Sequence, residues 1–133
     1  MRDLAQRLVD PLWSSIVANP RPRLTYVEFQ NGEIICAQGE HAYRTFVLLA
    51  GDIAVERNGE VIAEDNREGT FLGENATLTG RPRTASIRAV GRVQALMFNA
   101  AELEQFVVIH PAVGLRLMKA LALRGRVDNE THY

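Results

Sequence analysis

The sequence predicts an α+β domain that is mainly β. We expect an antiparallel β-roll or jelly-roll barrel of about seven or eight strands, with a helical segment before it, one short helix within it and two helices after it. Short β-branched and aromatic runs alternate with turn residues from 24 to 98, and apolar residues return at helical spacing on either side. One domain over 1–133 is therefore expected, with a helical lead over 1–20, the β-roll over 24–98 and C-terminal helices over 99–126.

The helical lead contains a break. Pro11 should divide it into two short helices, because proline removes a helical hydrogen bond. Four apolar residues lie at helical spacing across the break: Leu4, Leu8, Leu12 and Ile16. The proline-containing residues 19–23 form a linker into the roll.

Turn residues divide 24–98 into short strands. Asn58-Gly59 stands between two β-type runs and predicts a type I′ hairpin, which needs a positive φ at both central residues. Gly51 should separate a strand over 44–50 from one over 52–57, and Gly91 should likewise separate 84–90 from 92–98.

The pattern becomes helical again after residue 98. Asn99, followed by Glu102, is close to a capping box, and the His-Pro pair at 110–111 should interrupt the helix. A last helix is expected from about 112 to 124, with Gly125 as its stop. Its apolar stripe is formed by Val113, Leu117 and Leu121.

Composition narrows the classes of function. The formal net charge is −1, which argues against a nucleic-acid partner. The single cysteine, Cys36, permits no internal disulfide and fits a reducing compartment. No apolar run is long enough to span a membrane. We expect a cytoplasmic domain that does not insert into the membrane.

Other candidate sites are weak. His41, His110 and His132 are too scattered for a metal site, and Cys36, in a predicted strand, is interpreted as a core residue. No helix-turn-helix accompanies the basic residues, and no nucleophile–base arrangement stands out. The sequence therefore predicts neither an enzyme nor a metal or organic cofactor. The basic residues are Arg81, Arg83, Arg88 and Arg92.

The stretch from 71 to 86, FLGENATLTGRPRTAS, holds the best candidate site. Gly73 permits close approach of a ligand, and residues 75–79 are long enough for one helical turn whose amides could face an anion. The Arg83 guanidinium suits two phosphate oxygens, and the Glu74 carboxylate suits ligand hydroxyls. A ligand with a phosphate and a sugar hydroxyl would satisfy both, whereas a simple Glu74–Arg83 ion pair is the alternative.

Two spaced motifs carry a resemblance to a known family. The first consists of Leu72-Gly73-Glu74, Ala76 and Arg83-Thr84-Ala85. The second, upstream, consists of Ile35-Cys36, Gly39-Glu40, Ala42, the apolar run 46–49 and Gly51. With these motifs the chain resembles the cyclic nucleotide-binding domain family over 24–124. The family includes the sensors of protein kinase A and G regulatory modules, of cyclic-nucleotide-gated channels and of bacterial catabolite-activator-type regulators.

The resemblance implies a role for each matching residue. The cyclic phosphate would be held by Arg83, Thr84, Ala76 and Ala85. The ribose 2′-hydroxyl would be held by Gly73 and Glu74. The sugar and base would be lined by Leu72, Val55, Asn75, Leu121 and Arg124. Val55 should face the interior together with Ile53, because alternate residues of a strand share a face.

The last helix would close over the base as a lid. Arg124 either contacts the base or only complements the helix C-terminus. Thr84 permits cGMP without requiring it, and we expect cAMP. The resemblance implies that movement of this helix signals to an effector domain or partner outside the chain. The alternative is a ligand-silent relative that acts in protein interaction or oligomerisation.

Overall fold

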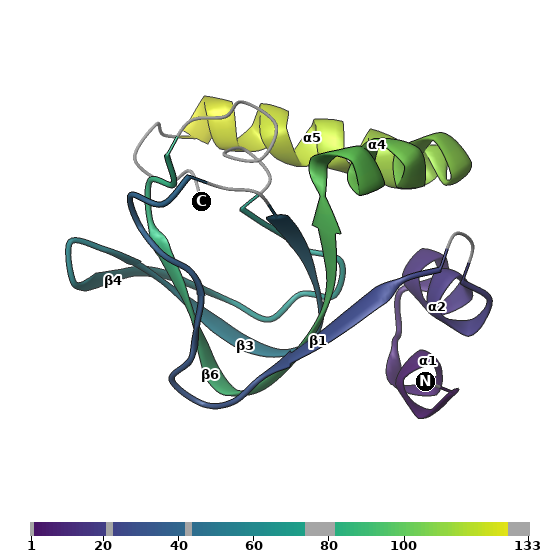
Figure 1. Cartoon of the computed structure of the whole chain (residues 1–133), viewed down its shortest axis with the longest axis horizontal. Coiled ribbons are helices and arrows are strands. Elements are labelled where there is room, and N and C mark those ends of the chain that lie inside the picture. Colours follow the sequence, from purple (N-terminus) through teal and green to yellow (C-terminus); the bar gives the residue numbers. More distant parts are fainter. Residues whose placement is uncertain (1, 21–22, 42–43, 74–81, 128–133) are drawn as a thin grey trace.

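The computed structural model describes residues 2–20, 23–41, 44–73 and 82–127, with residues 2, 3 and 123–127 described by their backbone alone (Figure 1). The strands form a strongly curved sheet, with α1 and α2 beside one end and α4 and α5 across another (Figure 1). The helices are α1 (Arg2–Arg7), α2 (Pro11–Ala18), α4 (Ala100–Ile109) and α5 (Pro111–Val127). The strands are β1 (Thr25–Phe29), β2 (Ile34–Cys36), β3 (Arg44–Arg57), β4 (Glu60–Asp65), β5 (Phe71–Leu72) and β6 (Ser86–Asn99).

All strand pairs of the sheet are antiparallel. The central order is β1-β6-β3-β4, while β2 also pairs with β6 and β5 also pairs with β3. β3 and β6 are the longest strands and pair from Arg44–Asn99 at one end to Glu56–Ser86 at the other. The antiparallel, mainly β fold expected from the alternating runs is confirmed.

The glycines expected to separate strands lie within strands instead. β3 runs continuously through Gly51, with register shifts around it, and β6 runs through Gly91. Gly51 has φ +105°, and a Cβ there would lie 2.4 Å from the Arg92 carbonyl oxygen. Glycine therefore bends the paired strands without ending them. The part of the chain that the structure describes accordingly has a six-stranded sheet, and not seven or eight strands.

Most of the predicted boundaries are confirmed. Asn58 and Gly59 have φ of 54° and 84° between β3 and β4, and Asn99 and Glu102 form the expected capping box. Pro11 begins α2 after the expected break. The stop expected at Gly125 is wrong, because α5 continues to Val127. A glycine inside a helix costs only about 1 kcal/mol and does not by itself end it.

The core divides into two clusters on opposite faces of the sheet. The helix-side cluster packs Val47, Leu49 and Leu96 against the helices, including Val113 and Leu117 of α5. The inner cluster fills the concave side of the sheet, and several of its members are fully buried. These are Leu48, Ile53, Val55, Leu72 and Ile87. The division follows strand alternation, because adjacent residues of β3 enter different clusters.

Trp13 joins the helical lead to the rest of the helix-side cluster. Its ring stacks on Phe106 with centroids 6.1 Å apart and meets Phe71 edge-on at 6.3 Å. A Cβ at Gly69 would lie 2.3 Å from Trp13 Nε1, so the chain leading to β5 passes directly against the indole. Trp13 and Phe106 are both fully buried, so the indole anchors the helical lead in the core.

Candidate functional site

Arg83 lies just before β6 and is only 9% exposed. Its Nη2 donates to the Arg44 carbonyl oxygen at 2.7 Å, and its Nη1 donates to the Gly73 carbonyl oxygen at 3.3 Å. Within the described ranges, no carboxylate forms an ion pair with this guanidinium. Two neutral carbonyls thus orient a buried positive charge and leave other N–H donors of the fork for a further acceptor.

The loop between β2 and β3 fixes the backbone of Arg83 from the other side. The Arg83 N–H donates to the Glu40 carbonyl at 2.8 Å, and the Gly39 N–H donates to the Arg83 carbonyl at 2.8 Å. A further bridge joins His41 and Pro82. The upstream Gly39-Glu40 motif therefore acts by positioning the arginine.

Position 73 requires glycine because the Arg83 guanidinium lies against the backbone of Gly73. Its φ is +78°, and an added Cβ would lie 1.8 Å from Arg83 Nη1. No L side chain fits there without displacing the guanidinium. The glycine that ends β5 is thus a condition for the position of Arg83.

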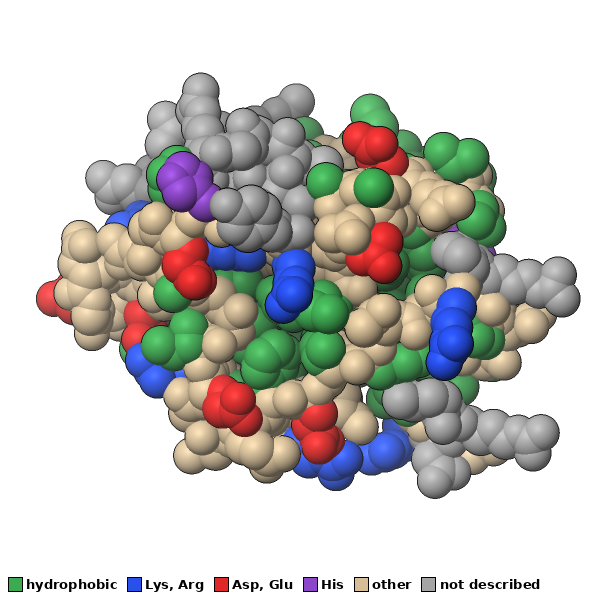
Figure 2. Space-filling model, viewed as in Figure 1, with side chains coloured by type: hydrophobic (Ala, Val, Ile, Leu, Met, Phe, Trp, Pro, Cys, Tyr) green, Lys and Arg blue, Asp and Glu red, His purple; other side chains and the backbone are tan. Residues whose placement is uncertain are grey.

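A pocket of about 500 Å³ opens at this guanidinium. It is lined by Ile35, Glu40, His41, Arg44, Phe46 and Arg83. Figure 2 shows hydrophobic side chains exposed at the centre of the face seen in Figure 1, with Lys or Arg beside them. A cavity with an apolar wall and a buried cation is suited to an anionic ligand that also carries apolar surface.

Three of the predicted site residues lie in the inner cluster, which also contains Ile35 and Phe46 of the pocket lining. Leu72, Val55 and Ala85 are buried in one inner cluster, and Val55 pairs with Ile87 across β3 and β6. Val55 and Ile53 share the inner face, as strand alternation predicted. Thr84 is exposed beside them, and its carbonyl accepts a hydrogen bond from Arg57 Nε at 3.1 Å.

Of the predicted site residues that the structure describes, only Arg83 lines the pocket itself. Leu121 is half-buried and packs against the helix-side cluster, on the opposite face of the sheet from Leu72 and Val55. Glu74, Asn75 and Ala76 lie outside the described residues, and so do the short helix expected at 75–79 and the side chain of Arg124. Their roles stay predictions.

Five described residues of the pocket lining were not predicted as site residues. Ile35, Glu40 and Phe46 belong to the upstream motif but were given no ligand role, and Arg44 and His41 belong to neither motif. Arg44 supplies the carbonyl that accepts from Arg83 Nη2, and both residues line the cavity. A backbone acceptor leaves no trace in residue type, so the carbonyl of Arg44 could not have been found from the sequence. His41 could have been suspected, because it directly follows the Gly39-Glu40 motif.

Cys36 lies beneath this site and is 1% exposed, which confirms the interpretation that it is a core residue. Burial raises the pKa of its thiol to about 11, although the nearby Arg83 guanidinium acts to lower it. At neutral pH the side chain is therefore a protonated thiol and a poor nucleophile.

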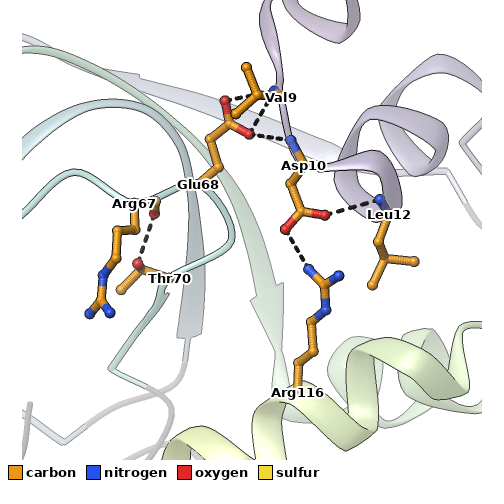
Figure 3. Close-up of polar contacts among 7 residues, drawn as sticks. All are labelled: Val9, Asp10, Leu12, Arg67, Glu68, Thr70 and Arg116. Atoms are coloured by element: carbon orange, nitrogen blue, oxygen red, sulfur yellow. Dashed lines mark hydrogen bonds and ion pairs between the residues drawn. The ribbon is translucent and has the colours of Figure 1, made fainter.

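A chain of polar contacts ties α5 to the helical lead and to the loop before β5 (Figure 3). Arg116 of α5 pairs with Asp10 at 2.5 Å, and Asp10 also caps α2 by accepting from the Leu12 N–H at 3.0 Å. Glu68, in the loop before β5, accepts from the Val9 N–H at 3.0 and 2.9 Å and from the Asp10 N–H at 2.9 Å. The segment between α1 and α2 is thus held from two sides.

Despite burial, these contacts lower the pKa of the Asp10 carboxyl. Burial acts to raise its pKa, but hydrogen bonds from Arg116 and from the Leu12 N–H outweigh burial and hold the pKa below its ordinary value of 3.8. The carboxylate is therefore charged at neutral pH and available to Arg116.

The described residues contain neither a metal-binding cluster nor a helix that could span a membrane. Over 2–20, 23–41, 44–73 and 82–127, no group of His, Cys, Asp or Glu is arranged to hold a metal ion. Among the helices in those ranges, none combines the length and the hydropathy needed to cross a membrane.

Comparisons with known proteins identify the family of this chain. A family model described as the cyclic nucleotide-binding domain matches residues 26–110. A putative potassium channel protein of Rhodopseudomonas palustris is 26% identical over 113 residues, which cover 80% of this chain and 27% of the channel. A CRP-like cAMP-activated global transcriptional regulator of Mycobacterium tuberculosis is 26% identical over 123 residues, which cover 86% of this chain and 53% of the regulator.

A solved structure of similar fold is also found. The catabolite activator protein of Thermus thermophilus superposes with a TM-score of 0.71 at 21% identity, over 92% of this chain and 58% of that protein. The chain thus spans only part of the length of these relatives. It covers about a quarter of the channel protein and about half of the transcriptional regulator. Because the family match covers more than half of the chain and includes Arg83, Gly73 and the loop that positions them, the chain belongs to the cyclic nucleotide-binding domain family.

Proposed function

We propose that this chain binds a cyclic nucleotide as a regulatory sensor, with the cyclic phosphate on Arg83. The observation that carries the proposal is the buried guanidinium, which has backbone carbonyls for partners and, among the described residues, no carboxylate. Burying a charge is costly unless an opposite charge accompanies it. A ligand phosphate would supply that charge and accept from the remaining N–H donors.

The rest of the ligand would follow from the phosphate. The hydroxyl of Thr84 lies next along the chain for a further phosphate contact, with the amides of Ala76 and Ala85. Gly73 and Glu74 would hold the ribose hydroxyl. Leu72 and Val55 already form an apolar wall of the inner cluster, against which the sugar and base would pack. Asn75 and Arg124 complete the proposed contacts, and Leu121 would reach the base only if α5 moved from the helix-side cluster.

We favour cAMP over cGMP as the ligand. The supporting observation is that a relative with sequence similarity over 86% of this chain is a cAMP-activated regulator. A hydroxyl at Thr84 is compatible with either base. The preference is decided by competition between the two nucleotides for one site, measured as the ratio of their dissociation constants.

A change in α5 would pass the signal to an effector domain or partner. α5 is joined through Arg116 and Asp10 to the segment that Glu68 holds, and Glu68 stands shortly before β5 and Gly73. Movement of α5 would therefore strain the contacts of Glu68 near β5, and movement near β5 would strain the Arg116–Asp10 pair. The ligand can shift the position of α5 only by binding one position more tightly than the other.

Thermal unfolding with added nucleotide tests the proposal. A ligand present at about 100 times its Kd stabilises the folded protein by about 2.7 kcal/mol. For a domain of this size, that should raise Tm by several degrees, roughly 5 °C or more. We expect this shift with cAMP and a smaller one with cGMP at equal concentration.

Variants at two arginines show whether the ligand-induced Tm shift depends on Arg83 itself or only on the overall charge of the protein. Arg83→Lys keeps the charge but loses the planar fork, and we expect most of the ligand-induced shift to disappear. Arg92→Lys is the matched control, because it makes the same substitution at an exposed arginine of β6 that pairs with Glu28 on the sheet surface. Unchanged Tm with both nucleotides at millimolar concentration would instead support a ligand-silent interaction module.

A further inference from the structure

Helix α5 carries apolar residues on two opposite faces. The inward face contains Val113 and Leu117, which are buried, and Leu121, which is half-buried. On the opposite face, Leu115 is 53% exposed and Met118 is 67% exposed, and the exposed Ala122 follows. We call Leu115, Met118 and Ala122 the outer stripe. A helix that is apolar on both faces usually has a neighbour on each.

The spacing of the outer stripe specifies the kind of neighbour. Leu115, Met118 and Ala122 follow an i, i+3, i+7 pattern, which matches one heptad of the a/d seam in a two-helix contact. Such a seam is narrow and suits one packed helix better than a broad apolar surface. Val108, at 79% exposed, and Ile109, at 46%, add apolar area near the junction of α4 and α5. Figure 2 shows hydrophobic side chains reaching the surface in the region of α4.

The charges of α5 specify the chemistry of the partner. Its sequence from 111 to 127 contains no Asp or Glu, and its cations are Arg116, Lys119, Arg124 and Arg126. Arg116 is paired with Asp10. Lys119 is exposed beside the outer stripe and has no carboxylate partner in the described part of the chain. A second copy of α5 would set like charges against each other, whereas an acidic helix would pair with them.

We propose that the outer stripe of α5 binds an amphipathic helix whose apolar seam is flanked by Glu or Asp. Leu115 and Met118 supply the apolar contact, and Lys119 selects the acidic partner. The surface lies on the opposite side of α5 from the core and does not involve Arg83. Its occupancy is therefore measurable without nucleotide and independently of the proposed nucleotide binding.

A pair of synthetic peptides tests this surface. Each has four heptads with Leu at a and d, and the flanking e and g positions are all Glu in one peptide and all Lys in the other. At neutral pH the like charges keep each peptide from pairing with itself. Binding to the labelled peptide is followed by fluorescence anisotropy without nucleotide. We expect the Glu peptide to bind at least about tenfold more tightly than the Lys peptide, and to weaken as salt increases.

Variants assign the binding to the outer stripe. Met118→Glu should weaken binding of the Glu peptide by at least about tenfold, and Lys119→Glu should remove the preference for that peptide. Val61→Glu is the control, because Val61 is 56% exposed on β4 and should not affect binding. Circular dichroism checks that each variant is folded.

Three results would overturn the proposal. The first is equal binding of the two peptides, or none. The second is a dimer in sedimentation that Met118→Glu dissociates, because a second copy would then occupy the stripe. The third is tighter binding to vesicles containing phosphatidylserine than to the Glu peptide, with the same sensitivity to Met118→Glu, because the surface would then be a membrane contact.

Discussion

Arg83 is held by backbone groups from three segments of the chain. The carbonyls of Gly73 and Arg44 orient its guanidinium, and the loop containing Gly39 and Glu40 pairs with its backbone. These contacts fix the side chain before any ligand arrives, so less rotamer entropy is lost on binding. The same contacts make the site depend on residues that need never touch the ligand, above all Gly73.

Substituting Gly73 tests this dependence. In Gly73→Ala the new methyl group would lie 1.8 Å from Arg83 Nη1, and the φ of +78° would be strained. We expect at least a tenfold loss of nucleotide affinity, together with destabilisation of about 1–3 kcal/mol. Titration calorimetry and urea unfolding measure the two effects. Gly59→Ala has a similar φ of +84° with open space around the Cβ, so it should cost stability but leave affinity unchanged.

At the scale of elements, α2 and α5 share one carboxylate. Asp10 caps α2 through the Leu12 N–H and pairs with Arg116 of α5. Both partners of the ion pair are partly exposed, so it should contribute only about 0.2–1 kcal/mol. Its importance is positional, because it joins helices that are far apart in the sequence.

Asp10→Asn separates the two roles, because asparagine is an equally good N-cap but carries no charge. The pKa of Asp10 is lowered in the folded state, so its charge contributes stability above the ordinary value of 3.8, and this contribution is lost as pH falls through the folded pKa. We expect Asp10→Asn to be less stable than the parent by up to about 1 kcal/mol at pH 7, with the difference vanishing well below pH 3.8. Urea unfolding at both pH values measures it. A difference independent of pH would contradict the ion-pair account.

At the scale of the whole molecule, the helical lead, the sheet and the C-terminal helices share one cluster centred on Trp13 and Phe106. The inner cluster, with the candidate site, lies on the other face of the same sheet. The contacts of Glu68, Asp10 and Arg116 join the loop before β5 to α5 around the edge of the sheet. We propose that the two faces communicate through these contacts.

Hydrogen exchange with and without cAMP tests this communication. Saturating nucleotide should slow exchange in α5 and in the segment that joins α1 to α2, by roughly tenfold. Arg116→Gln should keep the effect near Gly73 but abolish it in the joining segment, because the link from α5 to Asp10 is removed. Lys119→Gln, one turn along the same helix, is the control. Undiminished protection of the joining segment in Arg116→Gln would exclude the proposed route.

Much of this protein is determined by local sequence pattern. The Asn58-Gly59 hairpin, the Asn99 cap, the break at Pro11 and the alternation that buries Ile53 with Val55 depend on neighbouring residues only, so the sequence predicts them. Arg83 and Gly73 were singled out by the first motif, although their contact with each other was not predicted. Residue type alone indicates that Arg83 offers several hydrogen-bond donors and that Gly73 has no side chain.

Tertiary structure decided what depends on distant segments. Gly51 and Gly91 bend long strands because β3 and β6 pair across them, and a turn pattern cannot reveal the partner strand. The Arg44 carbonyl reaches Arg83 from a residue 39 positions away in the chain. Leu121 packs with the helices because α5 lies on the helix-side cluster. Local patterns set which elements form and which faces they bury, whereas the packing of one element on another decides which of those faces meet.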